Sequence, residues 1–198
     1  MDSRVGRVER LTGETTVVVE LELGGQGYAV TTGVGFFDHM LATLAHHAGV
    51  GLTVRADGDL VVDAHHTVED VGLAVGQALA EALGERRGIQ RFGFAYAPLD
   101  EALARAVVDL SGRPYAWVAF PQGLELALVT STFPLTLVAE FFKALASRGL
   151  LTLHLDVERG RDPHHAAEAA FKAFALALRQ AVQLVSGTVP STKGTLHL

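Results

Sequence analysis

The chain of 198 residues contains no cysteine. Without thiols it can form neither a disulfide nor a thiolate metal site, which suits a reducing compartment such as the cytoplasm. It also lacks any apolar run approaching the about 20 residues that span a bilayer. The N-terminal segment MDSRVGRVERLTGE is charged and lacks the apolar stretch of a signal peptide. We therefore expect a cytoplasmic protein that does not enter a membrane.

Basic residues are fewer than acidic ones, with 16 Lys+Arg against 22 Asp+Glu and a formal net charge of −6. A chain with this balance and no stripe of basic residues is a poor candidate for binding nucleic acid. A single site could still take an anionic ligand. Because 49% of the residues are hydrophobic and only 19% are charged, a sizeable core is available and global disorder is excluded.

The same order of strands and helices is predicted twice along the chain. In the first half, alternation predicts strands at 15–23 and 28–32, and helical spacing predicts helices at 36–47 and 66–83. Residues 51–56 and 59–63 read as a hairpin around Asp57-Gly58. The second half repeats the pattern, with the following expected elements: strands 105–110, 115–120 and 151–157, and helices 137–146 and 164–184. A polar, glycine-rich tail, 186–198, follows.

A short motif marks the start of each long helix. His65-His66-Thr67-Val68-Glu69 begins one, and His164-His165-Ala166-Ala167-Glu168 begins the other. In the preceding shorter helices, the separation of His39 from His65 nearly equals that of Glu140 from His164. We infer an internal duplication of about 100 residues.

Repeat 1 then covers about 1–90 and repeat 2 about 91–185. No linker rich in proline and serine separates them, so residues 1–198 are expected to form one pseudo-symmetric domain.

The paired motifs suit metal binding. Residues i and i+4 share a helix face, so His65 pairs with Glu69, and His164 with Glu168. The second histidine of each motif is rotated by about 100° and could serve another metal. Imidazole with carboxylate suits Mn, Fe, Ni, Co or Zn better than Mg or Ca, and spacing does not choose among them. One such motif could simply complement a helix dipole, but its recurrence favours ligation.

Several motifs together resemble the imidazoleglycerol-phosphate dehydratase family of histidine biosynthesis. They are Phe36-Phe37-Asp38-His39-Met40-Leu41, Asp63-Ala64-His65-His66-Thr67-Val68-Glu69-Asp70, Ser111-Gly112-Arg113-Pro114, the second His-His motif and Pro190-Ser191-Thr192-Lys193-Gly194. The resemblance implies an α+β fold of internally duplicated βα halves, each a four-stranded sheet with two helices packed on one face. It also implies self-association into a 24-subunit shell built from trimers, with Mn2+ pairs at subunit contacts.

The resemblance further implies two Mn2+ ions per subunit. One would take His39, His66, His164 and Glu168; the other would take His65, Glu69, His165 and the residue at position 140. Here the chain departs from the family pattern Leu-Val-Glu-His-Phe-Phe, because it reads Leu137-Val138-Ala139-Glu140-Phe141-Phe142. Glutamate can bind Mn2+, and Glu140 occupies the place in repeat 2 that His39 occupies in repeat 1. We therefore keep Glu140 as an expected ligand.

The implied reaction is the dehydration of D-erythro-imidazoleglycerol phosphate to imidazole-acetol phosphate. It would pass through a metal-bound imidazolate and a diazafulvene-like intermediate, because the C–H bond to be broken is not acidic and the ring must store electrons. The implied catalytic residues are Glu14, Glu69 and Glu168, with proton transfer assigned to Glu14. The implied substrate-binding residues are Glu14, His47, Arg91, Arg113, Lys172, Ser191, Thr192 and Lys193.

Two other functions fit parts of the pattern. A dimetal phosphoester hydrolase would use the same ligand types, but no Asp-rich bridging motif occurs. A metal-storage or shell-forming protein would leave Glu14, Arg91, Arg113 and Lys193 without a purpose.

Overall fold

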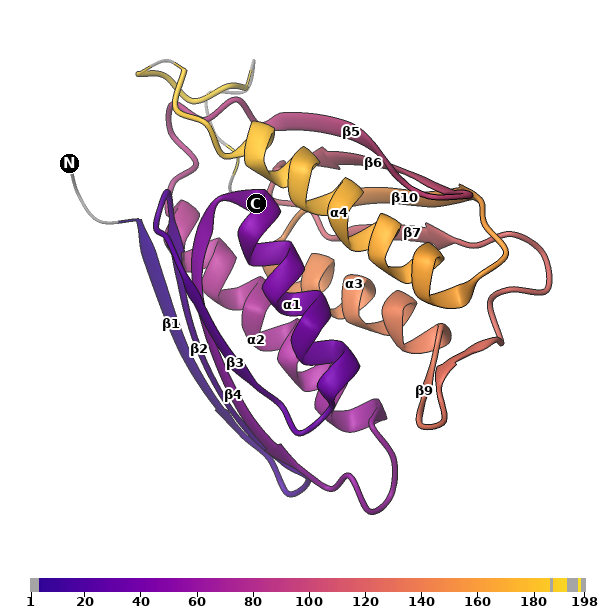
Figure 1. Cartoon of the computed structure of the whole chain (residues 1–198). Coiled ribbons are helices and arrows are strands. Elements are labelled where there is room, and N and C mark those ends of the chain that lie inside the picture. The colour runs from indigo at the N-terminus through magenta and orange to yellow at the C-terminus, as the bar shows by residue number, and fades with distance from the viewer. Residues whose placement is uncertain (1–3, 186, 192–195, 197–198) are drawn as a thin grey trace.

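The computed structural model describes residues 4–185, 187–191 and 196. Within these residues the fold is α+β, with two four-stranded sheets enclosing four helices (Figure 1). The expected fold class is confirmed. No helix in the described part of the chain is long and apolar enough to cross a membrane.

The two sheets have the same topology. Sheet 1 runs in the order β1-β2-β4-β3 and sheet 2 in the order β5-β6-β10-β7. In each, the third strand of the row is antiparallel to the second and parallel to the fourth. The strands of sheet 1 are β1 (Val5–Leu11), β2 (Thr15–Leu23), β3 (Tyr28–Thr31) and β4 (Val50–Gly58). Those of sheet 2 are β5 (Phe92–Leu99), β6 (Ala102–Asp109), β7 (Tyr115–Ala119) and β10 (Thr152–Arg159).

Each sheet carries its own pair of helices. Sheet 1 is covered by α1 (Gly35–Ala48) and α2 (His65–Leu83), and sheet 2 by α3 (Thr136–Gly149) and α4 (Pro163–Ala181). A small pair of strands, β8 (Leu128–Thr130) and β9 (Phe133–Pro134), precedes α3. Hydropathy patterning does not predict strands β1, β5, β8 and β9.

The predicted hairpin around Asp57-Gly58 is wrong. β4 continues to Gly58, and residues 59–63 form a turn instead of a strand. Both edges of β4 are already hydrogen-bonded, one to β2 and the other to β3. A returning strand would therefore find no free edge, although Val61 and Val62 have the side chains of a strand.

Helices from the two repeats pack against each other in a crossed fashion. The short helix α1 of repeat 1 contacts the long helix α4 of repeat 2, and the long α2 contacts the short α3. Buried phenylalanines fill the space between the layers: Phe37 of α1 lies 5.3 Å from Phe141 of α3, and Phe141 lies 5.3 Å from Phe171 of α4, centroid to centroid. Because each repeat buries its helices against the other, the two share one core.

Two glycines let the long helices lie close to the sheets. A Cβ added at Gly6 of β1 would overlap the carbonyl of Ala78 in α2, and one added at Gly93 of β5 would overlap the carbonyl of Ala177 in α4. The two contacts are equivalent in the two repeats. A hydrogen in place of a methyl group is therefore what allows this spacing between helix and edge strand.

We predict that Gly6→Ala and Gly93→Ala each lower the free energy of unfolding by about 1–3 kcal/mol, because the backbone must move to admit the methyl group. Urea denaturation measures the change. Gly13→Ala is the matched control, since nothing lies within 4 Å of its added Cβ. Equal stability of all three variants would contradict the close-packing explanation.

Candidate metal and substrate site

Three side chains from two helices form the clearest candidate metal site. Nε2 of His39 lies 3.5 Å from Oε2 of Glu168, and Nε2 of His164 lies 3.4 Å from the same oxygen. Possible ligand atoms of all three lie within 4.8 Å of one another. His39 comes from α1 of repeat 1, whereas the other two come from α4 of repeat 2. Neither repeat alone could supply this group.

The start of α4 fixes the direction of its possible metal ligands. Pro163 opens the helix, and the side chain of Asp162 accepts hydrogen bonds from the backbone N–H groups of His164, at 2.8 Å, and His165, at 3.4 Å. This is a standard N-cap, which satisfies donors that the first helical turn leaves unpaired. With the start fixed, His164 and Glu168 share the face that packs against α1.

Lys172 holds the other oxygen of Glu168. Its Nζ lies 2.6 Å from Oε1, so Oε2 is the oxygen that faces the two histidines. Burial raises the pKa of Glu168, but Lys172 and His39 outweigh this effect and the pKa lies below its ordinary value. His47 lies in the same region, close enough for Lys172 to act on its charge. Burial and then the charges of His46 and Lys172 lower the pKa of His47. The carboxylate is thus held ionised beside an imidazole pair.

The equivalent positions on α2 and α3 are arranged differently. Nε2 of His65 lies 3.7 Å from Oε2 of Glu69, as their spacing predicts. Glu140 instead accepts a hydrogen bond of 2.8 Å from Lys143 on its own helix. Among the described residues, His39, His164 and Glu168 are the one set of three possible ligands whose ligand atoms lie close together. The structure therefore brings His65 and Glu69 together and leaves Glu140 in an ion pair.

Glu14 and His66 form a second polar cluster, at the start of α2. Glu14 lies in the β1–β2 turn, with Oε2 3.7 Å from Nδ1 of His66. The turn is tied to α2 through the buried Asp70, which accepts hydrogen bonds from Thr15 (2.5 Å) and Arg10 (2.8 Å). This anchor places the exposed carboxylate of Glu14 beside the His-His motif.

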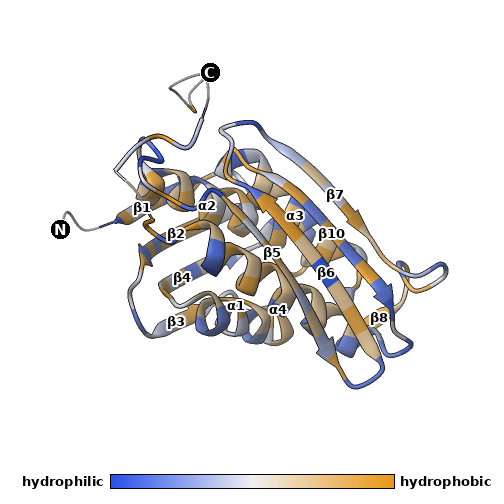
Figure 2. Ribbon diagram, turned by 90° about the horizontal axis from the view of Figure 1, so that it is seen from above, coloured by the Kyte–Doolittle hydropathy of each residue, from blue (hydrophilic) through white to orange (hydrophobic). Residues whose placement is uncertain are grey.

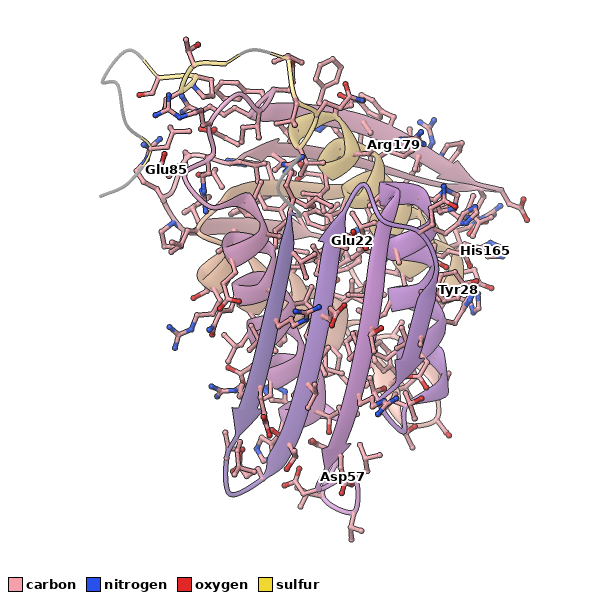
Figure 3. The ribbon with its side chains drawn as sticks, turned by 90° about the vertical axis from the view of Figure 1, so that its left-hand side faces the viewer. Glu22, Tyr28, Asp57, Glu85, His165 and Arg179 are labelled. Carbon is pink, nitrogen blue, oxygen red and sulfur yellow. The ribbon has the colours of Figure 1, made fainter. Side chains whose placement is uncertain are left out.

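Both second histidines of the motifs hydrogen-bond to carboxylates. Nδ1 of His66 lies 3.0 Å from Oδ2 of Asp59, and Nδ1 of His165 lies 2.8 Å from Oε2 of Glu101. These hydrogen bonds raise the pKa of each histidine. Hydrogen bonds from the backbone of Asp162, from His165 and from the backbone of Arg161 lower the pKa of Glu101 to about 2. His165 lies at the margin of the molecule in Figure 3.

Of the predicted phosphate-binding residues, Arg91, Arg113 and Ser191 lie at the other end of α4, whereas Lys172 and His47, expected close to them, lie in the region of Glu168. Arg91 makes two hydrogen bonds to Asp109, of 2.7 and 3.1 Å, and Nη2 of Arg113 lies 3.9 Å from the same carboxylate. Arg91 also donates to the carbonyl of Pro190, next to Ser191. Its backbone N–H binds the carbonyl of Ala181, the last residue of α4, whereas Glu168 lies in the first turns of that helix. Thr192 and Lys193 lie outside the described residues.

The remaining histidines have other surroundings. His46 stacks edge-on against His47 at 5.1 Å, and His154 lies 5.6 Å from Tyr115, ring to ring. Sequence reasoning missed four carboxylates that organise the site: Asp59, Asp70, Glu101 and Asp109. Asp70 belongs to the motif that contains His65 and His66, and the spacing of Glu101 from Gly93 equals that of Glu14 from Gly6; Asp59 and Asp109 had no such signal.

Comparison with known proteins identifies the family. The family model for imidazoleglycerol-phosphate dehydratase matches residues 32–178. The imidazoleglycerol-phosphate dehydratase of Halorhodospira halophila is 55% identical over 99% of this chain and 100% of its own length. The chain belongs to the imidazoleglycerol-phosphate dehydratase family. The enzyme of Thermobifida fusca is 52% identical over 98% of this chain and 100% of its own length.

Solved structures of imidazoleglycerol-phosphate dehydratases share the fold. The crystal structure from Staphylococcus aureus has a TM-score of 0.80 at 37% identity and covers 91% of this chain and 99% of its own. That from Pyrococcus furiosus, in complex with (S)-C348, has a TM-score of 0.82 at 37% identity and covers 95% and 99%. Membership of the imidazoleglycerol-phosphate dehydratase family makes this chain a lyase that carries out a dehydration in histidine biosynthesis.

Proposed function

We propose that this dehydratase is metal-dependent and converts D-erythro-imidazoleglycerol phosphate to imidazole-acetol phosphate at sites shared between copies of the chain. The observation that carries the proposal is the convergence of His39, His164 and Glu168 from opposite repeats. Two imidazoles and a carboxylate that is held ionised form a donor set suited to Mn2+. The residues present therefore fit the metal, and we propose two Mn2+ per subunit.

The placement of the other expected ligands supports sharing between copies. His66 lies beside Asp59 and Glu14, and His165 lies beside Glu101, so neither is part of the group around Glu168 within one chain. We propose that His66 of a second copy completes the set of His39, His164 and Glu168. By the same reasoning, His165 of a second copy completes the set of His65, Glu69 and Glu140.

The outer faces of the two sheets favour self-association. Sheet 1 presents charged side chains such as Arg7, Glu20 and Glu22 (Figure 3). Sheet 2, which faces the viewer in Figure 2, exposes more than half of each of five aromatic side chains: Phe92, Phe94, Tyr96, Tyr115 and Trp117. An aromatic face of this kind is typical of a protein–protein contact. It supports contact between copies of the chain, which assembly into trimers and a larger shell of 24 subunits requires.

The chain's own residues account for orientation and proton transfer. A bound divalent ion supplies a Lewis acid that makes an imidazole N–H of the substrate easier to deprotonate. Glu14, exposed and held by its anchored turn, moves the proton at the substrate's carbon chain. Lys172 keeps Glu168 ionised, and Arg113, Arg91 and Ser191 hold the phosphate, with the planar guanidinium groups matched to its oxygens.

The proposed function is tested by incubating Mn2+-loaded protein with imidazoleglycerol phosphate. We expect an enolisable ketone to form while the phosphate ester stays intact. Release of inorganic phosphate without ketone would indicate a hydrolase. Absence of any turnover in the metal-loaded assembly would favour a storage or shell protein.

Removing the metal should abolish activity and also break the assembly into smaller species, because ligands on different copies would lose the ion that joins them. Light scattering before and after chelation measures the change, and adding back Mn2+ should restore both properties. An intact shell after verified removal of all metal would refute the coupling.

Glu14→Gln should lower turnover by about 10²-fold or more, the usual effect of losing a general acid or base. Metal content and assembly should stay unchanged, because Glu14 is not among the proposed ligands. Steady-state kinetics and metal analysis provide the measurements. Glu9→Gln, an exposed glutamate on the neighbouring strand β1, is the matched control. Near-normal activity of Glu14→Gln would contradict a role in proton transfer and show that Glu14 is only a surface carboxylate.

Glu140→Ala should lower occupancy of one metal of each pair at limiting Mn2+, because a ligand is lost. Glu140→His should keep two metals and shift preference toward Zn2+ or Ni2+. Lys143→Ala is the control, since it removes the ion pair of Glu140 but keeps its carboxylate. Full two-metal occupancy in Glu140→Ala would show that Glu140 is not a ligand.

A further inference from the structure

The two carboxylates beside the second histidines have no role in the proposed reaction. Asp59 lies in the turn after β4, and Glu101 lies in the turn between β5 and β6. Each binds Nδ1 of its histidine, His66 or His165, at 3.0 or 2.8 Å. The first histidines of the two motifs, His65 and His164, differ because each turns Nε2 toward a glutamate, and His39 does the same.

Hydrogen bonding of this kind determines which ring nitrogen can bind a metal. An ionised carboxylate only accepts hydrogen bonds, so Nδ1 of the histidine must carry the proton. In the neutral ring the lone pair is then on Nε2, which becomes the metal-binding atom. Carboxylates that fix the tautomer in this way also fix the orientation of the ring.

The duplication shows how the two repeats divide this task. Gly6 and Gly93 make equivalent contacts with α2 and α4, and Glu14 and Glu101 follow them at the same spacing. In repeat 2 this turn glutamate, Glu101, binds the histidine directly. In repeat 1 its equivalent, Glu14, stands 3.7 Å from Nδ1 of His66, because Asp59 makes the shorter contact. Asp59 therefore leaves Glu14 available for chemistry.

The second oxygen of each carboxylate, which does not contact the histidine, also has surroundings that fit this role. Oε1 of Glu101 accepts backbone hydrogen bonds from Arg161, at 3.0 Å, and Asp162, at 2.8 Å, so its Oε2 is fixed toward His165. Asp59 has a buried Oδ1 without a hydrogen-bond partner in the described part of the chain. An orphaned carboxylate oxygen costs stability, which argues against a purely structural role for Asp59.

We propose that Asp59 and Glu101 are positioning residues that hold His66 and His165 with Nδ1 protonated and Nε2 directed to a metal shared with another copy. The proposal rests on the proposed function, because it takes both histidines as ligands. It assigns the two turn glutamates of the duplication different tasks: proton transfer for Glu14 and histidine positioning for Glu101.

Glu101→Gln tests the proposal with little change in shape. The amide oxygen can keep the two backbone hydrogen bonds, so the NH2 group faces Nδ1 of His165 and donates to it. The ring proton then moves to Nε2, which blocks ligation. We expect affinity for Mn2+ to fall about 10- to 100-fold. Glu14→Gln, the same change at the equivalent position, should leave Mn2+ affinity unaltered and lower turnover instead.

Long-range 1H–15N spectra of the metal-free protein provide an independent readout, since they distinguish the two tautomers of His165. We expect the Nδ1–H form in the wild type and the Nε2–H form in Glu101→Gln. Asp59→Ala provides a second variant, which removes the acceptor for Nδ1 of His66 and is expected to lower Mn2+ affinity without lowering stability against urea.

The two proposals fail in different ways. Absence of Mn2+ binding in the wild type would overturn the proposed function. Unchanged Mn2+ affinity in both Glu101→Gln and Asp59→Ala, with the wild type binding Mn2+, would overturn the positioning role alone. An Nε2–H tautomer of His165 in the wild type would also overturn it.

Discussion

The crossed packing of helices between repeats is the contact on which the rest of the structure depends. The short helix of each repeat lies against the long helix of the other, and buried phenylalanines fill the joint. This packing places His39 of repeat 1 beside Glu168 of repeat 2, and it places α2 against α3. If the repeats packed only on their own sheets, the group of three possible ligands would not exist.

Close packing in turn depends on small residues. The long helix α4 buries a series of alanines, from Ala166 to Ala181, and Gly93 meets its backbone directly. With little side-chain bulk between helix and sheet, the position and rotation of α4 are tightly restricted. The N-cap at Asp162 then fixes where the helix begins, so that His164 and His165 leave it in different directions.

The duplication is symmetric in backbone but not in chemistry. Lys172 holds Glu168 ionised next to two histidines, whereas Glu140, in the other group of proposed ligands, pairs with Lys143. The turn glutamates differ as well: Glu101 lies 2.8 Å from Nδ1 of His165, whereas Glu14 lies 3.7 Å from Nδ1 of His66, which Asp59 contacts at 3.0 Å. We interpret these differences as specialisation within a shared frame.

The sequence by itself determined the repeat, the helices and the i,i+4 pairs, because these depend on local spacing along the chain. Helix starts at the two His-His motifs and the alternation of β2 were predictable for that reason. The tertiary structure alone decided that residues 59–63 find no strand partner, since both edges of β4 are occupied. It alone paired Asp59 with His66 and gathered Arg91 and Arg113 around Asp109. Such contacts depend on where separate elements meet, which local hydropathy and spacing do not specify.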